Sequence, residues 1–234
     1  MCRLFAVIAK EPKALKEWLI ESKNSILEQS KEHRHGWGLA WLENRNFRID
    51  KSTTPAYKDK TFLALAQMIN SKLNIVHIRK ASVGTIKLEN NQPFIRGKWV
   101  FTHNGTISNY KKLLPLINVK HLRGETDSEV FFQLLMKNLK KLCAEKAISK
   151  TVADIARLCR YSSLNCIFSE GEKLYALRMY KKEPSYYRMN YLMADECVVV
   201  SSEKIGNGKW EKMNNHELMV VDKKCNINIK RIAV

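Results

Sequence analysis

The chain has 234 residues and carries 41 Lys and Arg against 23 Asp and Glu, which gives a formal net charge of +18. A hydrophobic fraction of 45% and a charged fraction of 27% exclude a largely disordered chain, and nine Gly with five Pro exclude a collagen-like one. The positive charge is spread along the chain, without a basic run of five residues and without a helix-turn-helix or RNA-binding aromatic motif, so the sequence does not predict a nucleic-acid partner.

The predicted elements run from strands to helices and back to strands. In chain order they are a strand over 3–9, a helix from Pro12 to about Gln29, a hairpin over 36–43 and 47–52, a helix over 60–70, strands over 73–82 and 98–107, and helices over 127–143 and about 150–160. From residue 163 onward the pattern is mostly β, with a hairpin around Glu170 and Gly171 and three further strands. Strands on both sides of a central helical pair predict an α+β fold with two sheets and flanking helices, in one domain over residues 1–234.

The hydropathy of the chain gives no sign of a membrane segment or a leader. No window approaches the run of about 18 apolar residues that a membrane helix needs. The apolar stretch over 4–9 is shorter than the core of a signal peptide, and Glu11 follows it closely. We therefore expect a cytoplasmic protein without a membrane partner.

The chain has six cysteines, of which one stands apart. Five lie in apolar surroundings and none forms a Cys-x-x-Cys pair, so we expect small buried hydrophobic side chains there, and neither a metal nor a cofactor. Cys2 differs because initiator Met is generally removed before a small residue, which would leave Cys2 with a free α-amine. That amine, with an ordinary pKa of roughly 7.7–8.0, can take the thiol proton and activate the sulfur as a nucleophile. The alternative for Cys2 is a core residue at the start of a strand.

Three other segments carry residues suited to the same chemistry. Arg79 ends a strand among small residues, where its planar fork could hold a carboxylate. Asn104 and Gly105 follow an apolar strand and could supply two donors to an oxyanion, or could form a hairpin turn. Asp127 stands at the start of a long helix, where it could bind a cation, or where it or Thr126 could cap the helix. Together these segments predict a ligand with an α-carboxylate, an α-ammonium and a side-chain acyl group, which describes glutamine and γ-glutamyl compounds.

The sequence resembles the class II glutamine amidotransferases, which are N-terminal nucleophile hydrolases, and in particular their stand-alone branch without a synthase domain. The resembling segments occur in the family's order across nearly the whole chain. They are MCRLF at 1–5, HGWGLAW at 35–41, HIRKAS at 77–82, FTHNGTI at 101–107, GETDSE at 124–129, NCIFSEGEKLYALR at 165–178 and VVVSSEKI at 198–205. The resemblance implies a four-layer αββα fold over the single domain 1–234, with Met1 removed.

The resemblance also implies roles for individual residues. Cys2 would be the nucleophile, with its own α-amine as the base, and Asn104 and Gly105 would form the oxyanion hole. Arg79 would bind the α-carboxylate of the substrate and Asp127 its α-ammonium.

Other matched positions would act less directly. Ser82 lies where a hydroxyl residue of the family assists substrate binding. The resemblance gives no catalytic role to Trp37 and Gly38 in the GWG segment, and a structural role is at least as consistent for the Ser202–Glu203 segment. Lys80 departs from the pattern, because synthase-linked members have an aromatic lid residue there.

The leading interpretation is an amidohydrolase that forms a γ-glutamyl thioester on Cys2 and passes the acyl group to water. With glutamine as the substrate, the products would be glutamate and ammonia. We expect the chain to be too short for a second catalytic domain, so any synthase that uses this ammonia would be a separate protein. Lys80 in place of the aromatic residue favours a larger leaving group, especially one with a carboxylate. The alternative is a non-catalytic interaction or regulatory subunit that docks through its basic surface.

Overall fold

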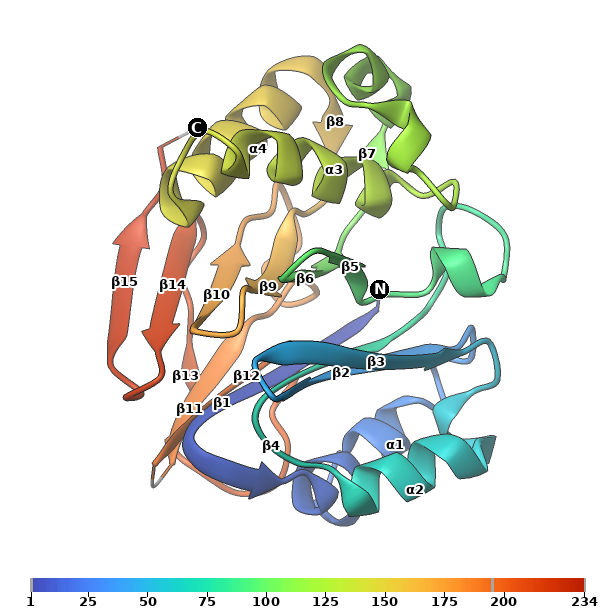
Figure 1. Cartoon of the computed structure of the whole chain (residues 1–234), viewed down its shortest axis with the longest axis vertical. Coiled ribbons are helices and arrows are strands. Elements are labelled where there is room, and N and C mark those ends of the chain that lie inside the picture. The colour runs from blue at the N-terminus through green and yellow to red at the C-terminus, as the bar shows by residue number, and fades with distance from the viewer. Residues whose placement is uncertain (1, 195, 234) are drawn as a thin grey trace.

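The computed structural model describes residues 2–194 and 196–233, and within them the strands form two large antiparallel sheets (Figure 1). The first sheet has the strand order β13-β11-β12-β1-β4-β2-β3. Its strands are β1 (Arg3–Ala14), β2 (Trp37–Glu43), β3 (Asn46–Ser52), β4 (Asn70–Ile78), β11 (Asn190–Ala194), β12 (Cys197–Ser201) and β13 (Glu211–Lys212). Because β1 lies between β12 and β4, the N-terminal segment runs through the middle of the sheet.

The second sheet has the strand order β15-β14-β10-β9-β6-β5. Its strands are β5 (Phe94–Arg96), β6 (Trp99–Asn104), β9 (Asn165–Ser169), β10 (Lys173–Arg178), β14 (Glu217–Asp222) and β15 (Ile227–Arg231). A separate short pair, β7 (Ile107–Ser108) and β8 (Arg160–Tyr161), lies beyond the end of β6. The hairpin expected around Glu170 and Gly171 is confirmed as the β9–β10 pair.

Helices cover the outer face of each sheet, so the fold has four layers (Figure 1). α1 (Ile26–Gln29) and α2 (Lys60–Met68) lie on the first sheet, whereas α3 (Asp127–Leu139) and α4 (Ala144–Leu158) lie on the second. Short 3-10 helices lie in the connections between these elements, at Ala56–Lys58, Leu88–Asn90, Tyr110–Leu116 and Val119–His121. No helix within the described residues has the length and apolar character needed to cross a membrane. The expected α+β fold with two sheets and flanking helices is confirmed.

Three hydrophobic clusters separate the four layers, and β1 contributes to two of them. Leu4 and Ala6 point between the two sheets, whereas Phe5 and Val7 point toward the helices on the first sheet. All four side chains are fully buried. A strand buried on both faces explains the uninterrupted apolar run near the N-terminus. The same burial fixes where the residue that precedes β1 lies.

The helix expected from Pro12 to Gln29 is wrong in its first part, because β1 continues to Ala14. The pairing of β1 with β4 shifts register between Ile8 and Lys13, and Pro12 lies within that irregularity. A proline is tolerated at a bulge, where its missing N–H breaks no ladder bond. In the rest of the range expected to be helical, the described structure has the short π-helix η1 (Glu17–Glu21) and α1. The last expected helix also begins earlier than predicted, at Ala144.

Candidate active site

Cys2 immediately precedes β1, and its thiol faces the end of the neighbouring strand β4. In the β1–β4 ladder Arg3 pairs with Ile78, which brings Cys2 beside the residues that follow β4. The Lys80 backbone N–H donates a hydrogen bond to Cys2 Sγ at 3.3 Å. Burial raises the pKa of the Cys2 thiol, and this outweighs the opposite effects of the Lys80 hydrogen bond and the Arg79 charge. The sulfur is therefore a thiol at neutral pH and needs a base to become a nucleophile.

Arg79 is the first residue after β4, and its guanidinium is held by the loop that follows. It donates hydrogen bonds to the carbonyl oxygens of Thr85 at 3.0 Å, Val83 at 3.2 Å and Gly84 at 3.4 Å. It also donates to Asn91 Oδ1 at 3.2 Å. The side chain is only 3% exposed. Four fixed contacts hold the planar fork in one orientation before any ligand arrives.

Asn104 ends β6 with a buried side-chain amide that has no hydrogen-bond partner within the described residues. A buried amide without a partner costs roughly 1–3 kcal/mol, so this group is suited to bind a ligand atom. Gly105 follows where the chain passes close to Ser163: a Cβ added there would lie 1.9 Å from the Ser163 carbonyl oxygen. The hairpin-turn alternative for Asn104 and Gly105 is wrong, because β6 pairs with β5 and β9 and the next strand, β7, pairs with β8.

Asp127 is the first residue of α3 and is almost completely buried. Its Oδ2 accepts a hydrogen bond from the Ile107 backbone N–H at 2.6 Å. Burial raises the pKa of the Asp127 carboxyl, although the nearby His103 acts in the opposite direction. The capping alternative holds for Thr126, whose Oγ1 accepts a hydrogen bond from the Glu129 N–H at 3.2 Å. Asp127 is thus left to face the cavity.

The six residues singled out by the sequence lie around two small cavities, both of which are lined by Cys2. Arg79 and Asp127 line the first cavity together with Cys2, Ser82 and Gly105. Asn104 lines the second, again with Cys2, Ser82 and Gly105. Ser82 is exposed, and its Oγ lies 3.1 Å from Thr106 Oγ1. The fold therefore brings together residues that are 125 positions apart, from Cys2 to Asp127.

Asn90 and Gln92, in the segment Asn90–Gln92, also border the first cavity, and sequence reasoning did not identify this segment. Gln92 Oε1 accepts a hydrogen bond from the His103 N–H at 2.6 Å, next to Asn104. Asn91, as noted, accepts one from Arg79. The only signal in the sequence is a run of three amides before Pro93, which does not reveal these distant partners.

The GWG segment at 36–38 packs against the Asn90–Gln92 segment. A Cβ added at Gly38 would lie 2.1 Å from the Gln92 carbonyl oxygen, so only glycine allows the two backbones to approach. Trp37 is fully buried, and its indole N–H donates to Asp59 Oδ2 at 2.9 Å. Neither residue lines the two cavities, which agrees with their having no catalytic role.

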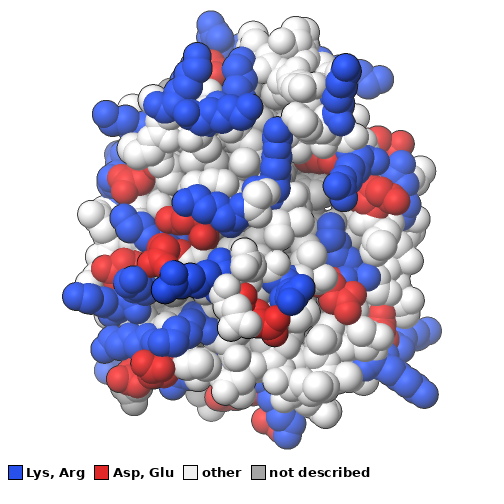
Figure 2. Space-filling model, viewed as in Figure 1, with Lys and Arg blue, Asp and Glu red and all other residues white. Residues whose placement is uncertain are grey.

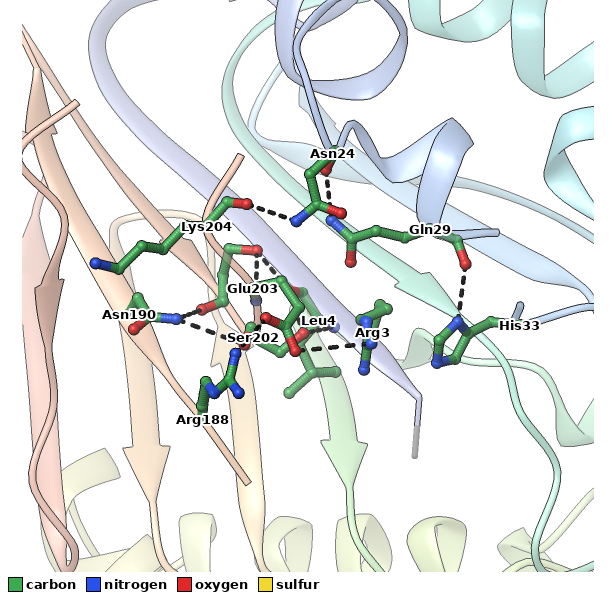
Figure 3. Close-up of polar contacts among 11 residues, drawn as sticks. Arg3, Leu4, Asn24, Gln29, His33, Arg188, Asn190, Ser202, Glu203 and Lys204 are labelled. Atoms are coloured by element: carbon green, nitrogen blue, oxygen red, sulfur yellow. Dashed lines mark hydrogen bonds and ion pairs between the residues drawn. The ribbon is translucent and has the colours of Figure 1, made fainter. Parts of the chain in front are cut away.

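Ser202 and Glu203 hold the start of β1 in place (Figure 3). The Leu4 N–H donates to Ser202 Oγ at 3.0 Å, and the Ser202 N–H donates to the Leu4 carbonyl at 2.9 Å. The Glu203 carboxylate lies 3.6 Å from the Arg3 guanidinium and 3.1 Å from that of Arg188. These contacts fix the two residues that follow Cys2.

A larger cavity, of about 560 Å³, lies beside the segment that leads into β5. Lys51, Arg96, Arg123 and Phe94 are among its lining residues, and the described residues around it include no Cys, Ser or Thr. Volume alone therefore does not locate a nucleophile in this protein.

The raised pKa of Asp127 makes a prediction about stability. A folded-state pKa above the ordinary 3.8 means that folding favours the neutral carboxyl, so stability is lost as the pH rises from 3.8 to the raised pKa and the full cost is present above it. Asp127→Asn removes the charge but keeps an oxygen for the Ile107 N–H. We predict that the variant is at least as stable as the wild type at pH 7, and that its advantage shrinks as the pH falls from the raised pKa toward 3.8 and is absent below 3.8. Thermal unfolding of both proteins between pH 3 and 8 tests this. A Tm lower than wild type by more than roughly 3 °C at pH 7, about 1 kcal/mol for a chain of this size, would contradict it.

Comparison with known proteins gives several relatives. A Methanocaldococcus jannaschii protein named "Uncharacterized protein" is 29% identical over 231 residues, which cover 85% of this chain and 64% of the relative. A Haemophilus influenzae protein named "Putative glutamine amidotransferase" is 33% identical over 62% of this chain and 52% of the relative. A γ-glutamyl-hercynylcysteine sulfoxide hydrolase of Mycolicibacterium smegmatis is 25% identical over 75% of this chain and 78% of the relative. The chain spans between about half and two thirds of the length of the first two relatives.

The fold and the family are also recognisable in wider comparisons. A solved glutamine aminotransferase class-II domain protein from Silicibacter pomeroyi superposes with a TM-score of 0.74 at 21% identity, and the match covers all of both chains. At that identity the likeness concerns the fold, which is the N-terminal nucleophile hydrolase type. Residues 1–186 match the family described as "Glutamine amidotransferases class-II". Because this match covers well over half of the sequence, the chain belongs to the class II glutamine amidotransferases.

Proposed function

We propose that the protein hydrolyses the side-chain amide of glutamine or of a γ-glutamyl compound through a γ-glutamyl thioester on Cys2. One observation carries the proposal: the Cys2 thiol borders a cavity that is also lined by a buried cation, Arg79, and a buried anion, Asp127. An α-amino acid carries the two complementary charges on one carbon. With its α-carboxylate on Arg79 and its α-ammonium on Asp127, its side-chain carbonyl would extend toward the sulfur.

The reaction then proceeds by acyl transfer in two steps. The Cys2 sulfur forms a bond to the side-chain carbonyl carbon while its proton passes to a base, and the C–N bond breaks as the leaving amine takes a proton. Water then attacks the thioester, which releases glutamate and restores the thiol. The Asn104 amide and the Gly105 N–H are the proposed donors to the oxyanion in both steps.

The base in this scheme is the α-amine of Cys2, which becomes free when Met1 is removed. Burial raises the pKa of the thiol, so spontaneous ionisation is suppressed and an adjacent base is required. An α-amine titrates at roughly 7.7–8.0 in model compounds and can therefore accept a proton near neutral pH. The geometry of a single residue places this base next to the sulfur, and no separate His or Asp is needed.

The identity of the leaving group determines whether the reaction supplies ammonia to a synthase or degrades a larger γ-glutamyl compound. Glutamine would release ammonia, and a separate synthase would then be the partner that uses it. The relative named as a γ-glutamyl-hercynylcysteine sulfoxide hydrolase supports a larger γ-glutamyl substrate.

The alternative of a non-catalytic docking subunit is less well supported. Lys and Arg are scattered over the face in Figure 2 and are interleaved with Asp and Glu, without one dominant basic patch. A docking subunit would also have no use for the buried charges of Arg79 and Asp127, each of which costs desolvation free energy.

The first test of the mechanism concerns the nucleophile. Cys2→Ala should reduce glutamate release from glutamine by at least about 1,000-fold, because only binding and the oxyanion hole would remain. A glutamine-like diazo-ketone should label Cys2 in the wild type and spare the other five cysteines. Far-UV circular dichroism checks that the variant is folded. Activity in the folded Cys2→Ala protein, or labelling spread over several cysteines, would exclude the mechanism.

The second test concerns the two charged groups. Arg79→Lys keeps the charge but loses the planar fork, so it should raise KM for glutamine at least about tenfold. Asp127→Asn should do the same through loss of the ammonium partner, although we expect no loss of stability. Steady-state kinetics with glutamine decide both cases. If either variant kept kcat/KM within about threefold of wild type, a difference below roughly 1 kcal/mol, the role of that residue would be wrong.

A further inference from the structure

The second cavity at Cys2 offers space for the departing amine of the substrate. It shares Cys2, Lys80, Ser82 and Gly105 with the cavity that holds the two charged groups. Neither Arg79 nor Asp127 lines it. The first cavity measures about 20 Å³, little more than one water-sized molecule, so it must widen to admit the α-carbon of a substrate. With the α-carbon there, the bond to the leaving nitrogen would point past the sulfur into the second cavity. This assignment rests on the function proposed above.

The volume of this second cavity exceeds what ammonia requires. Its volume is about 110 Å³, whereas one water-sized molecule needs roughly 10–15 Å³ on the same measure. Ammonia is about the size of water, so most of the space would stay unused with glutamine as the substrate. The surplus can take a leaving group of several non-hydrogen atoms.

Two adjacent tyrosines give this cavity its chemical character. Tyr186 and Tyr187 both line it, and their rings meet edge to face with centroids 5.1 Å apart. Tyr187 is buried, whereas Tyr186 is 46% exposed at the rim. Lys80 lines the same space and has an exposed side chain. An aromatic wall beside a cation suits a leaving amine that carries an apolar or aromatic side chain and a carboxylate.

The loop that carries the two tyrosines is held by a buried arginine. Arg178 is 1% exposed, and its guanidinium donates to the carbonyl oxygens of Tyr187 at 3.0 Å, Pro184 at 2.8 Å and Met213. Asn165 Nδ2 donates to the same Tyr187 carbonyl at 3.3 Å. Because the buried Arg178 guanidinium donates its hydrogen bonds to loop carbonyls, it keeps the two tyrosines in place before substrate binds. Substrate binding therefore does not have to order this loop, and the two tyrosines can discriminate among leaving groups without that loss of conformational entropy.

We infer that the cavity formed by Lys80, Thr106, Tyr186 and Tyr187 is a leaving-group subsite, and that the substrates it selects are γ-glutamyl amino acids with an aromatic or large apolar side chain. Attack by Cys2 breaks the amide bond, and the free amino acid leaves with the proton returned by the α-ammonium of Cys2. Water then completes the cycle by releasing glutamate.

Four substrates separate the two features that the subsite recognises. γ-Glutamyl-phenylalanine carries both the ring and the carboxylate, γ-glutamyl-phenethylamide only the ring, γ-glutamyl-glycine only the carboxylate, and glutamine neither. Glutamate release should give the highest kcat/KM for γ-glutamyl-phenylalanine and the lowest for glutamine. Each feature should contribute about threefold to tenfold.

Two variants assign these contributions to residues. Lys80→Gln should lower the preference for γ-glutamyl-phenylalanine over γ-glutamyl-phenethylamide toward unity. Tyr186→Ser should lower the preference for γ-glutamyl-phenylalanine over γ-glutamyl-glycine. Lys182→Gln, in the same loop but outside the lining of the cavity, is the matched control and should keep both ratios at their wild-type values.

The outcomes distinguish this inference from the proposed function. If glutamine is hydrolysed at least as well as all three larger substrates, or if the ratios do not change in the Lys80 and Tyr186 variants, the subsite is wrong while the Cys2 mechanism stands. If no substrate releases glutamate and the diazo-ketone does not label Cys2, the proposed function itself is wrong.

Discussion

The pairing of β1 with β4 is the interaction on which the rest of the site depends. Because Arg3 lies opposite Ile78, the residue before one strand meets the residue after the other, and Cys2 lies beside Arg79. The register cannot slip by one residue, since Leu4 and Phe5 would exchange the inter-sheet core for the helix-facing core. Ser202 holds the same end of β1 by two hydrogen bonds to Leu4. Burial of an apolar strand on both faces thus positions Cys2, the proposed nucleophile, beside Arg79.

A second constraint is the free-energy cost of burying charge around Cys2. Arg79 and Asp127 are both almost completely buried, and burial shifts each pKa toward the neutral form, downward for Arg79 and upward for Asp127. Loop carbonyls and one backbone N–H compensate part of this cost, but the Asn104 amide has no partner in the described structure. A zwitterionic α-amino acid with a carbonyl at its far end would bring opposite charges to Arg79 and Asp127, and an acceptor oxygen to the unpartnered Asn104 amide. The binding free energy of such a ligand would therefore include relief of desolvation already present in the free protein.

Local sequence signals were sufficient for the sheets and for the residues that meet at Cys2. The alternating and apolar runs predicted most strands. Arg79 and Asn104 stand at strand ends and Asp127 at a helix start, where their neighbours in sequence identify them, whereas Ser82 was indicated only by the family resemblance. Pro12 misled the prediction, because a proline before apolar residues is typical of a helix start and the bulge that accepts it depends on β4. Tyr186, Tyr187 and Asn90–Gln92 were missed, since their importance arises from contacts with residues far away in the sequence. Arg178 was quoted only as part of a matching segment, and its burial under the loop is a tertiary feature.

The account rests on a covalent intermediate at an N-terminal cysteine, and mass spectrometry of the working enzyme tests this most directly. The protein is mixed with glutamine or γ-glutamyl-phenylalanine, quenched in acid during turnover, and digested, and the N-terminal peptide is weighed. We predict a peptide, released by digestion in acid, that begins at Cys2 and carries one γ-glutamyl group; acid keeps the α-amine protonated, so the group stays on the sulfur as a thioester. An active protein that retains Met1, or whose γ-glutamyl group lies on any residue other than Cys2, would contradict the account.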